Sequence, residues 1–288
     1  MRLLPLCLCT LVLGATAATS ATAGAWSKPA GGVYAKLGSS AFVSGHAYDN
    51  RGRRVDGDTF VLRAETLYAY AELGLTDDVT LVAFVPWAAA TNQHESGVRF
   101  HTLGFGDATL GAQVPVATWG PLRVSARVDG KVPLYRGGPS VQGRQSAAVP
   151  GYGRSARYFP ALGDGQVDMT SWVLGGMSLP AIDGFVGVEG GYRLRFGNIT
   201  DAIVALSTLG TWLLPGRLLL LVNAQSVMSL PSEDELRVAV GKGYLAFGPA
   251  CMVILGGGLT LELGYDVVTQ GVNTAGGTQL QLGISYAQ

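Results

Sequence analysis

Tyr68-Ala-Tyr-Ala-Glu-Leu-Gly-Leu75 runs into the turn residues Thr76-Asp-Asp78, and Val79-Thr-Leu-Val-Ala-Phe-Val-Pro-Trp87 follows. After a polar loop, Gly104-Phe-Gly-Asp107 opens a third run, Ala108-Thr-Leu-Gly-Ala-Gln-Val-Pro-Val116. Polar and apolar residues alternate in the last run, which indicates a strand with one apolar and one polar face. Soluble sandwiches have strands of about five or six residues, whereas membrane-spanning strands need about 9–11 residues and are separated by turns. The stretch therefore favours strands that span a membrane.

The rest of the chain repeats this unit of strand, turn and strand. The pattern predicts strands at 33–44, 59–75, 79–90, 103–117, 122–134, 166–179, 185–196, 202–213, 217–230, 235–247, 259–267 and 278–286. The apolar segment 248–258 stands where a turn is needed, and the pattern leaves open whether it extends a strand or forms a bulge. We expect an all-β fold, a closed antiparallel transmembrane β-barrel of about twelve strands (about ten to fourteen). Closure would leave no strand edge exposed.

The N-terminus carries a separate signal. Arg2 precedes the mainly apolar residues 3–14, and Ala21-Thr-Ala23 fits a cleavage site. We expect a signal peptide over 1–23 and one barrel domain over 24–288, because the apolar region is too short to span a membrane. A lipoprotein anchor at Cys7 or Cys9 is the alternative, although both cysteines come too early to follow a complete apolar region.

Composition narrows the class of protein. The chain is 48% hydrophobic and 14% charged, with 42 glycines and a formal net charge of zero. A neutral chain gives no reason to expect a nucleic-acid partner. Export and long amphipathic strands predict the outer membrane of a Gram-negative bacterium, with membrane lipid, a small-molecule solute and the barrel-assembly machinery as partners. Behind the signal peptide only Cys251 remains, which excludes an intramolecular disulfide.

Charged residues gather on the polar faces of several predicted strands. The predicted lumen-lining residues are Asp107, Arg123, Arg127, Asp129, Lys131, Glu189, Arg193, Arg195, Glu262 and Asp266. Mutual pairing that holds the shape of the barrel is one interpretation, and the near balance of signs favours it. A constriction that selects solutes by charge is the other.

Aromatic residues lie mostly near the ends of the predicted strands. They are Tyr34, Phe42, Tyr68, Trp87, Trp119, Trp172, Trp212, Tyr265 and Tyr286. We expect girdles at the two membrane interfaces, where amphipathic rings are enriched. Ordinary core positions are the alternative.

One loop contains residue types that could support catalysis. His94-Glu95-Ser96 and His101 provide a base, an acid and a nucleophile, but adjacent residues in a loop seldom reach the rigid geometry that nucleophilic catalysis needs. Two histidines do not complete a zinc site, and Gly104-Phe-Gly-Asp107 lacks the following helix of a nucleotide loop. We expect no enzyme, catalytic residue, cofactor or metal, with an outer-membrane hydrolase as the less favoured alternative.

Four segments resemble a known family. They are 25–34, 70–81, Gly104-Phe-Gly-Asp-Ala-Thr-Leu-Gly111, and 271–277 together with 282–286. These segments are similar to the outer-membrane proteins of the MetA pathway of phenol degradation, which distantly resemble long-chain fatty acid and aromatic hydrocarbon channels. The resemblance implies an outer-membrane barrel that transports small apolar or aromatic compounds, and it implies no catalytic residues. The stretch before Val33 is short for the lumen-filling plug of such channels.

Two functions follow from a barrel of this kind. The first is a passive channel, with the loop that carries Tyr152, Tyr158 and Phe159 folding over the mouth and the charged wall setting selectivity. The second is a structural or surface-binding barrel with a closed lumen, because about twelve strands enclose a bore that side chains could fill.

Overall fold

A computed structural model of the chain describes residues 24–56, 60–94, 97–135, 143–145, 160–197, 199–231 and 242–288. Within these ranges fifteen strands are hydrogen-bonded into one sheet, and the one helical element is a 3₁₀ turn at Pro180–Ile182. No helix in the described residues is long and apolar enough to cross a membrane. The predicted signal peptide, 1–23, lies outside the described residues.

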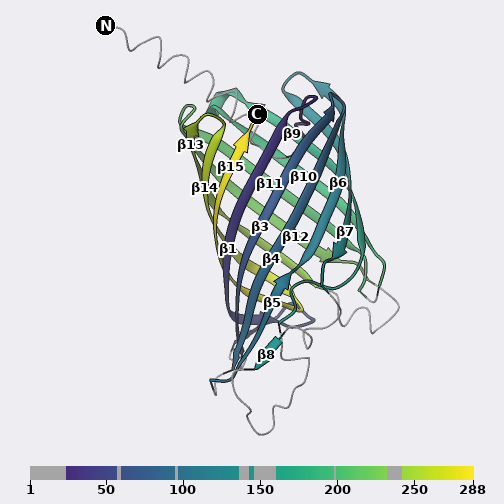
Figure 1. Ribbon diagram of the computed structural model, residues 1–288, viewed down its shortest axis with the longest axis vertical. Coiled ribbons are helices and arrows are strands. Elements are labelled where there is room, and N and C mark those ends of the chain that lie inside the picture. Colours follow the sequence, from purple (N-terminus) through teal and green to yellow (C-terminus); the bar gives the residue numbers. More distant parts are fainter. Residues whose placement is uncertain are drawn as a thin grey trace.

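The sheet closes into a barrel whose strands are tilted to its long axis (Figure 1). Its wall is built from β1 (Val33–Tyr48), β3 (Phe60–Thr76), β4 (Val79–His94), β5 (Arg99–Phe105), β6 (Asp107–Trp119), β7 (Leu122–Pro133), β9 (Asp168–Leu179), β10 (Gly184–Arg195), β11 (Ala202–Leu214), β12 (Leu218–Ser229), β13 (Gly243–Gly256), β14 (Leu259–Val272) and β15 (Thr274–Ala287). β2 (Arg54–Asp56) and β8 (Gly143–Gln145) are short strands paired to β1 and β5 near one end. β5 and β6 both pair with β4 and act as one wall strand, which gives the twelve strands predicted.

The bend between β5 and β6 falls on Gly106. Its N–H donates to the carbonyl oxygen of Pro86 at 3.0 Å. A Cβ at Gly106 would lie 2.9 Å from the carbonyl oxygen of Leu162, so the loop before β9 passes too close for any side chain. The sequence predicted one strand over 103–117, and the structure divides it at Gly106 into β5 and β6.

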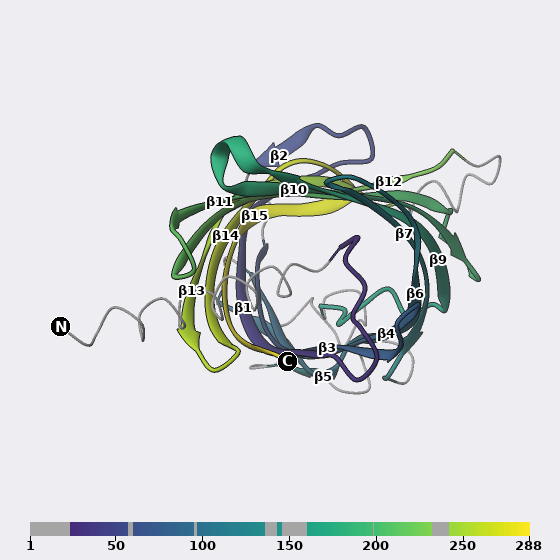
Figure 2. The ribbon, with the colours of Figure 1, turned by 90° about the horizontal axis from the view of Figure 1, so that it is seen from above.

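The first and last wall strands close the barrel. β1 pairs antiparallel with β15, from Tyr34 opposite Ala287 to Tyr48 opposite Thr274, and on its other side with β3. Seen along the axis, the strands form a continuous ring (Figure 2). Closure satisfies the backbone N–H and C=O groups of every wall strand, as a membrane interior without water requires.

The connections differ between the two ends of the barrel. At one end they are the short turns 77–78, 120–121, 180–183, 215–217 and 257–258. At the other end 49–59, 134–167, 196–201 and 230–242 are longer, whereas 95–98 and the single residue Asn273 are short. Outer-membrane barrels have short periplasmic turns and longer extracellular loops, so the short-turn end corresponds to the periplasm.

The predicted tenth strand, 235–247, is confirmed over 243–247, and residues 235–241 lie outside the described residues. The observed strand is β13, Gly243–Gly256, which continues through most of the segment 248–258 that the sequence left open. Gly248 and Pro249 suggested a break, but they lie where the ladder to β14 is interrupted, between Phe247–Val267 and Ala250–Gly264. A strand tolerates proline at such irregular pairings. Positive φ angles at Gly256, Gly257 and Gly258 place the turn further along the chain.

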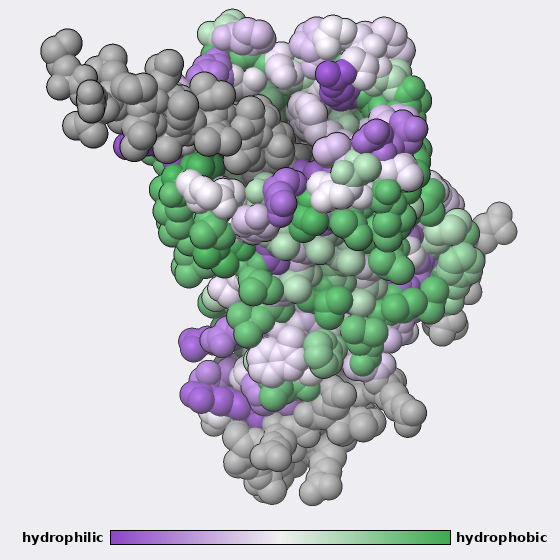
Figure 3. Space-filling view, turned by 45° about the horizontal axis from the view of Figure 1, so that its top comes forward, coloured by the Kyte–Doolittle hydropathy of each residue, from purple (hydrophilic) through white to green (hydrophobic). Residues whose placement is uncertain are grey.

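The outward faces of the wall strands are apolar. Large hydrophobic side chains that are more than 40% exposed include Leu37, Leu67, Leu110, Val173, Val188, Val222, Leu261 and Leu282. In space-filling view, hydrophobic residues gather over the middle of the visible wall, with hydrophilic residues toward both ends (Figure 3). This distribution fits a band of lipid around the barrel.

Leu282 and Gln279 give a direct test of which face meets lipid. Leu282 is 53% exposed on the outer face of β15, whereas Gln279 belongs to the inner face. We expect Leu282→Arg to destabilise the barrel by about 2–4 kcal/mol, the cost of arginine near the bilayer midplane, and Gln279→Arg to cost far less. The measurement is the urea midpoint in phospholipid vesicles. Equal losses in the two variants would contradict the assignment of faces.

Candidate solute passage

The inner faces of the wall carry most of the residues that the sequence predicted to line a lumen. Arg127 and Asp129 on β7 are each 8% exposed, and Lys131 and Glu189 are partly buried. Arg123 occupies the same face of β7 at the short-turn end and is exposed. The inner charges fall into separate groups, centred on Arg127 and on Lys131.

Arg127 is the centre of the first group. Its guanidinium lies 3.2 Å from the carboxylate of Asp129 and 3.1 Å from that of Glu189, and it stacks over the Trp172 ring at 4.9 Å. The indole N–H of Trp172 donates to Asp129 at 2.8 Å. These contacts join β7, β9 and β10, and they give a buried charge the partners that it needs.

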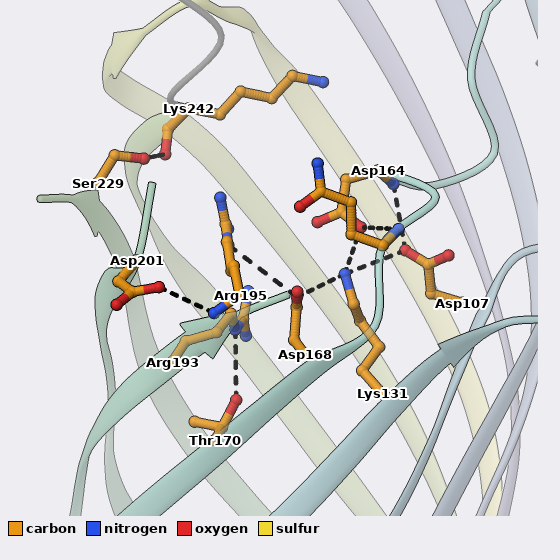
Figure 4. A network of polar contacts seen from close by, with 11 residues as sticks. Asp107, Lys131, Asp164, Asp168, Thr170, Arg193, Arg195, Asp201, Ser229 and Lys242 are labelled. Carbon is orange, nitrogen blue, oxygen red and sulfur yellow. Dashed lines mark hydrogen bonds and ion pairs between the residues drawn. The ribbon is translucent and has the colours of Figure 1, made fainter. Parts of the chain in front are cut away.

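Lys131 is the centre of the second group, near the long-loop end (Figure 4). Its ammonium contacts Asp107 at 3.3 Å, Asp168 at 2.7 Å and Asp164. Asp168 is 1% exposed, and Arg195 lies 4.0 Å from it on the other side. Here cations and carboxylates neutralise one another, as in the pairing interpretation.

Two groups of the adjoining loops have shifted pKa values. Burial raises the pKa of the Asp164 carboxyl, but its hydrogen bond and ion pair with Lys131 outweigh this, so the pKa lies below the ordinary value. Burial, together with the nearby Asp107, raises the pKa of the Tyr135 hydroxyl. Asp164 is therefore a carboxylate and Tyr135 a neutral phenol at neutral pH.

Glu262 and Asp266 lie apart from these groups, whereas Arg193 lies beside the second group (Figure 4). Glu262 pairs with Lys36 at 2.7 Å, and Asp266 accepts a hydrogen bond from the side-chain amide of Gln281 at 2.5 Å. Arg193 donates to Thr170 at 3.4 Å. Four further charged residues of the interior were not predicted from the sequence, namely Lys28, Lys36, Glu72 and Asp168. Lys36 and Glu72 follow the alternation of predicted strands and could have been found from it.

The expectation of aromatic girdles was wrong for most of the rings. Trp119 and Tyr286 are exposed on the outer face near strand ends, as expected, whereas Trp87 and Tyr265 are exposed in the middle of β4 and β14. Tyr34, Phe42, Tyr68, Trp172 and Trp212 face inward. Inside, Tyr34 contacts Tyr70 and Tyr68 contacts Phe84, with ring centroids 6.0 and 5.7 Å apart. One side of the interior therefore has an aromatic lining.

The stretch before β1, residues 24–32, enters the barrel, and we call it the inner segment. Figure 2 shows it as the dark purple trace inside the ring of strands. Its backbone accepts hydrogen bonds from Gln113 to Gly24 at 2.8 Å and from Ser125 to Ala25 at 2.6 Å. The inner segment thus docks on β6 and β7, although the sequence suggested that it was short for a plug.

Specific features of the wall accommodate the inner segment. A Cβ at Gly74 would lie 1.9 Å from the carbonyl oxygen of Pro29, and one at Gly176 would lie 2.6 Å from the Trp26 ring. Lys28 is buried, with its ammonium 3.4 Å from Glu72 and its backbone N–H bonded to Thr80 at 2.8 Å. The inner segment therefore packs closely against the wall, with glycines where the two approach most closely and a buried ion pair between Lys28 and Glu72.

A cavity of about 300 Å³ lies beside the inner segment. Phe185 lines it and meets Trp26 edge-on at 6.0 Å. Its other lining side chains come from β1 and from β10 to β15 and include Leu221, Met252, Glu262 and Asp266. The inner segment therefore occupies part of the interior and leaves a hollow beside it.

Most of the residues predicted to form the mouth loop or a catalytic loop fall outside the part of the chain that the structure describes. Tyr152, Tyr158, Phe159, Glu95, Ser96 and the side chain of His94 lie outside the described residues. The ring of His101 is 2.9 Å from the Thr91 hydroxyl. The described part of the chain contains no group of three histidine, cysteine or acidic residues that could hold a metal ion.

Glu72 should hold the inner segment in place. Glu72→Gln removes the carboxylate charge 3.4 Å from the buried Lys28 ammonium, and removing one partner of a buried pair costs about 3–5 kcal/mol. In a Cys251→Ser, Ser27→Cys background, we expect the substitution to speed labelling of residue 27 by a water-soluble maleimide more than tenfold. Glu65→Gln, the same change on the outer face of β3, is the control. Unchanged labelling in Glu72→Gln would show that the ion pair does not hold the segment.

Comparison with known proteins supports the fold. An outer membrane channel from Pseudomonas putida F1 matches with a TM-score of 0.69 and 17% identity, over 93% of this chain and 99% of that chain. The translocator domain of the autotransporter NalP from Neisseria meningitidis matches with a TM-score of 0.49 and 14% identity, over 88% of each chain. No protein-family model and no curated protein matches the sequence. The chain thus has the fold of outer-membrane β-barrels, and its closed sheet and apolar belt locate it in the outer membrane of a Gram-negative bacterium.

Proposed function

We propose that this barrel is a passive channel for small apolar or aromatic compounds. The observation that carries the proposal is the cavity of about 300 Å³ inside a closed wall. A protein that served only as a lipid-facing scaffold would gain stability from filling this space, because cavities in a core cost free energy. A cavity lined by both polar and apolar side chains offers a passing solute room and weak contacts on its way through the barrel.

The chemistry of the lining supports the solute class. Phe185, Leu206, Leu221 and Met252 offer apolar surface to the cavity. The resemblance of segments such as 104–111 to outer-membrane proteins of the MetA pathway of phenol degradation points the same way. Movement would be diffusive, with the paired charges of the wall setting selectivity and the loop of Tyr152, Tyr158 and Phe159 covering the mouth.

A closed barrel is the second candidate, and the inner segment favours it. Trp26, Lys28 and their partners cross a bore that twelve strands already make narrow. In this case the barrel would act through its loops as a structural or surface-binding protein. For either function we propose that the barrel-assembly machinery inserts the chain.

Electrical measurements in planar bilayers distinguish the two candidates. We expect the whole barrel to carry discrete single-channel currents in KCl, and we expect a small aromatic solute to occlude them. A variant that lacks residues 25–30 should show a conductance at least about twofold larger, since the inner segment occupies part of the bore. Currents from the shortened variant alone would favour the closed barrel. Absence of current from both would remove the channel.

A further inference from the structure

We propose that the cavity beside the inner segment is a binding subsite for small organic amines, with a protonated nitrogen paired to Asp266 and an apolar or aromatic body against Phe185 and Met252. This inference rests on the proposed channel function and names the solute chemistry of the cavity in its interior. The volume of about 300 Å³ is at the lower end of the roughly 300–1,000 Å³ typical of small-molecule sites.

The cavity has an apolar region that suits a hydrocarbon body. Phe185 on β10, Leu206 on β11, Leu221 on β12 and Met252 on β13 line it. Leu221 and Met252 belong to the same buried cluster, with Phe185 packed against it. A flat ring that leaves water for this surface would gain the usual free energy of apolar burial, and the polarisable thioether of Met252 favours aromatic neighbours.

The cavity also has a polar region with three carboxylates, and two of them have an ion-pair partner. Glu262 is paired with the Lys36 ammonium at 2.7 Å, and Glu189 shares the Arg127 guanidinium with Asp129, at 3.1 and 3.2 Å. The third is Asp266, whose contact among the described residues is the neutral amide of Gln281, with no ion pair. Among the described residues, Asp266 is therefore the lining carboxylate that a bound ammonium would pair with without displacing a resident cation.

A carboxylate without an ion-pair partner in a confined site selects for charge. A cation at hydrogen-bond distance is attracted more strongly there than in bulk water, because protein and solute displace the screening solvent. A neutral hydroxyl can donate a hydrogen bond to Asp266 but supplies no charge, and an anion is repelled. Asn223 and Gln225 add neutral amides to the lining, whose carbonyl oxygens can accept hydrogen bonds from an ammonium.

Three probes of nearly equal shape separate these contributions, namely benzylammonium, benzyl alcohol and benzoate. The readout is the concentration of each probe that halves the single-channel current of the whole barrel in planar bilayers. We expect benzylammonium to act at a concentration roughly tenfold below that of benzyl alcohol, the factor given by one charge-assisted hydrogen bond, with benzoate the weakest. Asp266→Asn should abolish the advantage of benzylammonium and leave benzyl alcohol unchanged.

Matched variants keep the test decisive. Asp78→Asn removes the same charge from an exposed turn at the short-turn end and should retain the preference. Gln281→Lys, which sets a resident ammonium beside the unaltered carboxylate, should lose it, and this variant serves if Asp266→Asn fails to insert. Equal potency of benzylammonium and benzyl alcohol in the native barrel, or a preference that survives in both cavity variants, would overturn the inference while currents persist. A native barrel without current would instead refute the channel itself.

Discussion

The structure depends on the absence of water beside its outer wall. In lipid, each backbone N–H and C=O group must find its partner within the protein, so a sheet that crosses a membrane has to close on itself. The pairing of β1 with β15 provides that closure along the length of both strands. Once the ring is closed, the two-residue period of each strand separates an apolar outer face from an inner face that can hold charge.

The inner face shows how charges are kept at low cost in a confined space. Arg127 and Lys131 each bind more than one carboxylate, and Lys28 is buried against Glu72. Pairing of this kind offsets the free energy of desolvation and ties neighbouring strands together. Asp266 differs, because a neutral amide is its described partner. Most charges of the inner wall are therefore paired. Selectivity for the charge of a solute would come from Asp266, whose described partner is uncharged.

The sequence predicted what period-two alternation encodes and little beyond it. The fold class, twelve wall strands and the inward direction of Arg127 and Asp129 follow from alternation in strands such as 122–134. The full length of β13 did not follow, because Pro249 and Gly248 imitate a turn. The docking of the inner segment inside the barrel could not be predicted either, because its partners are remote in the chain. The backbone N–H of Lys28 donates to Thr80, 52 residues away, and the carbonyl oxygen of Ala25 accepts from Ser125, 100 residues away. The aromatic rings were misplaced partly because predicted strands stopped short. Phe42, Trp87 and Tyr265 lie near the ends of 33–44, 79–90 and 259–267 but well inside β1, β4 and β14.

The central claim is that lipid touches one face of each strand and the aqueous lumen touches the other. Spin labels placed singly at residues 279 to 284 of β15 in lipid vesicles test it most directly, through their collision rates with oxygen, which concentrates in lipid, and with a water-soluble nickel chelate. The account predicts strict alternation, with oxygen dominant at 280, 282 and 284 and nickel dominant at 279, 281 and 283. Uniform collision rates along the strand, or the opposite phase, would contradict it.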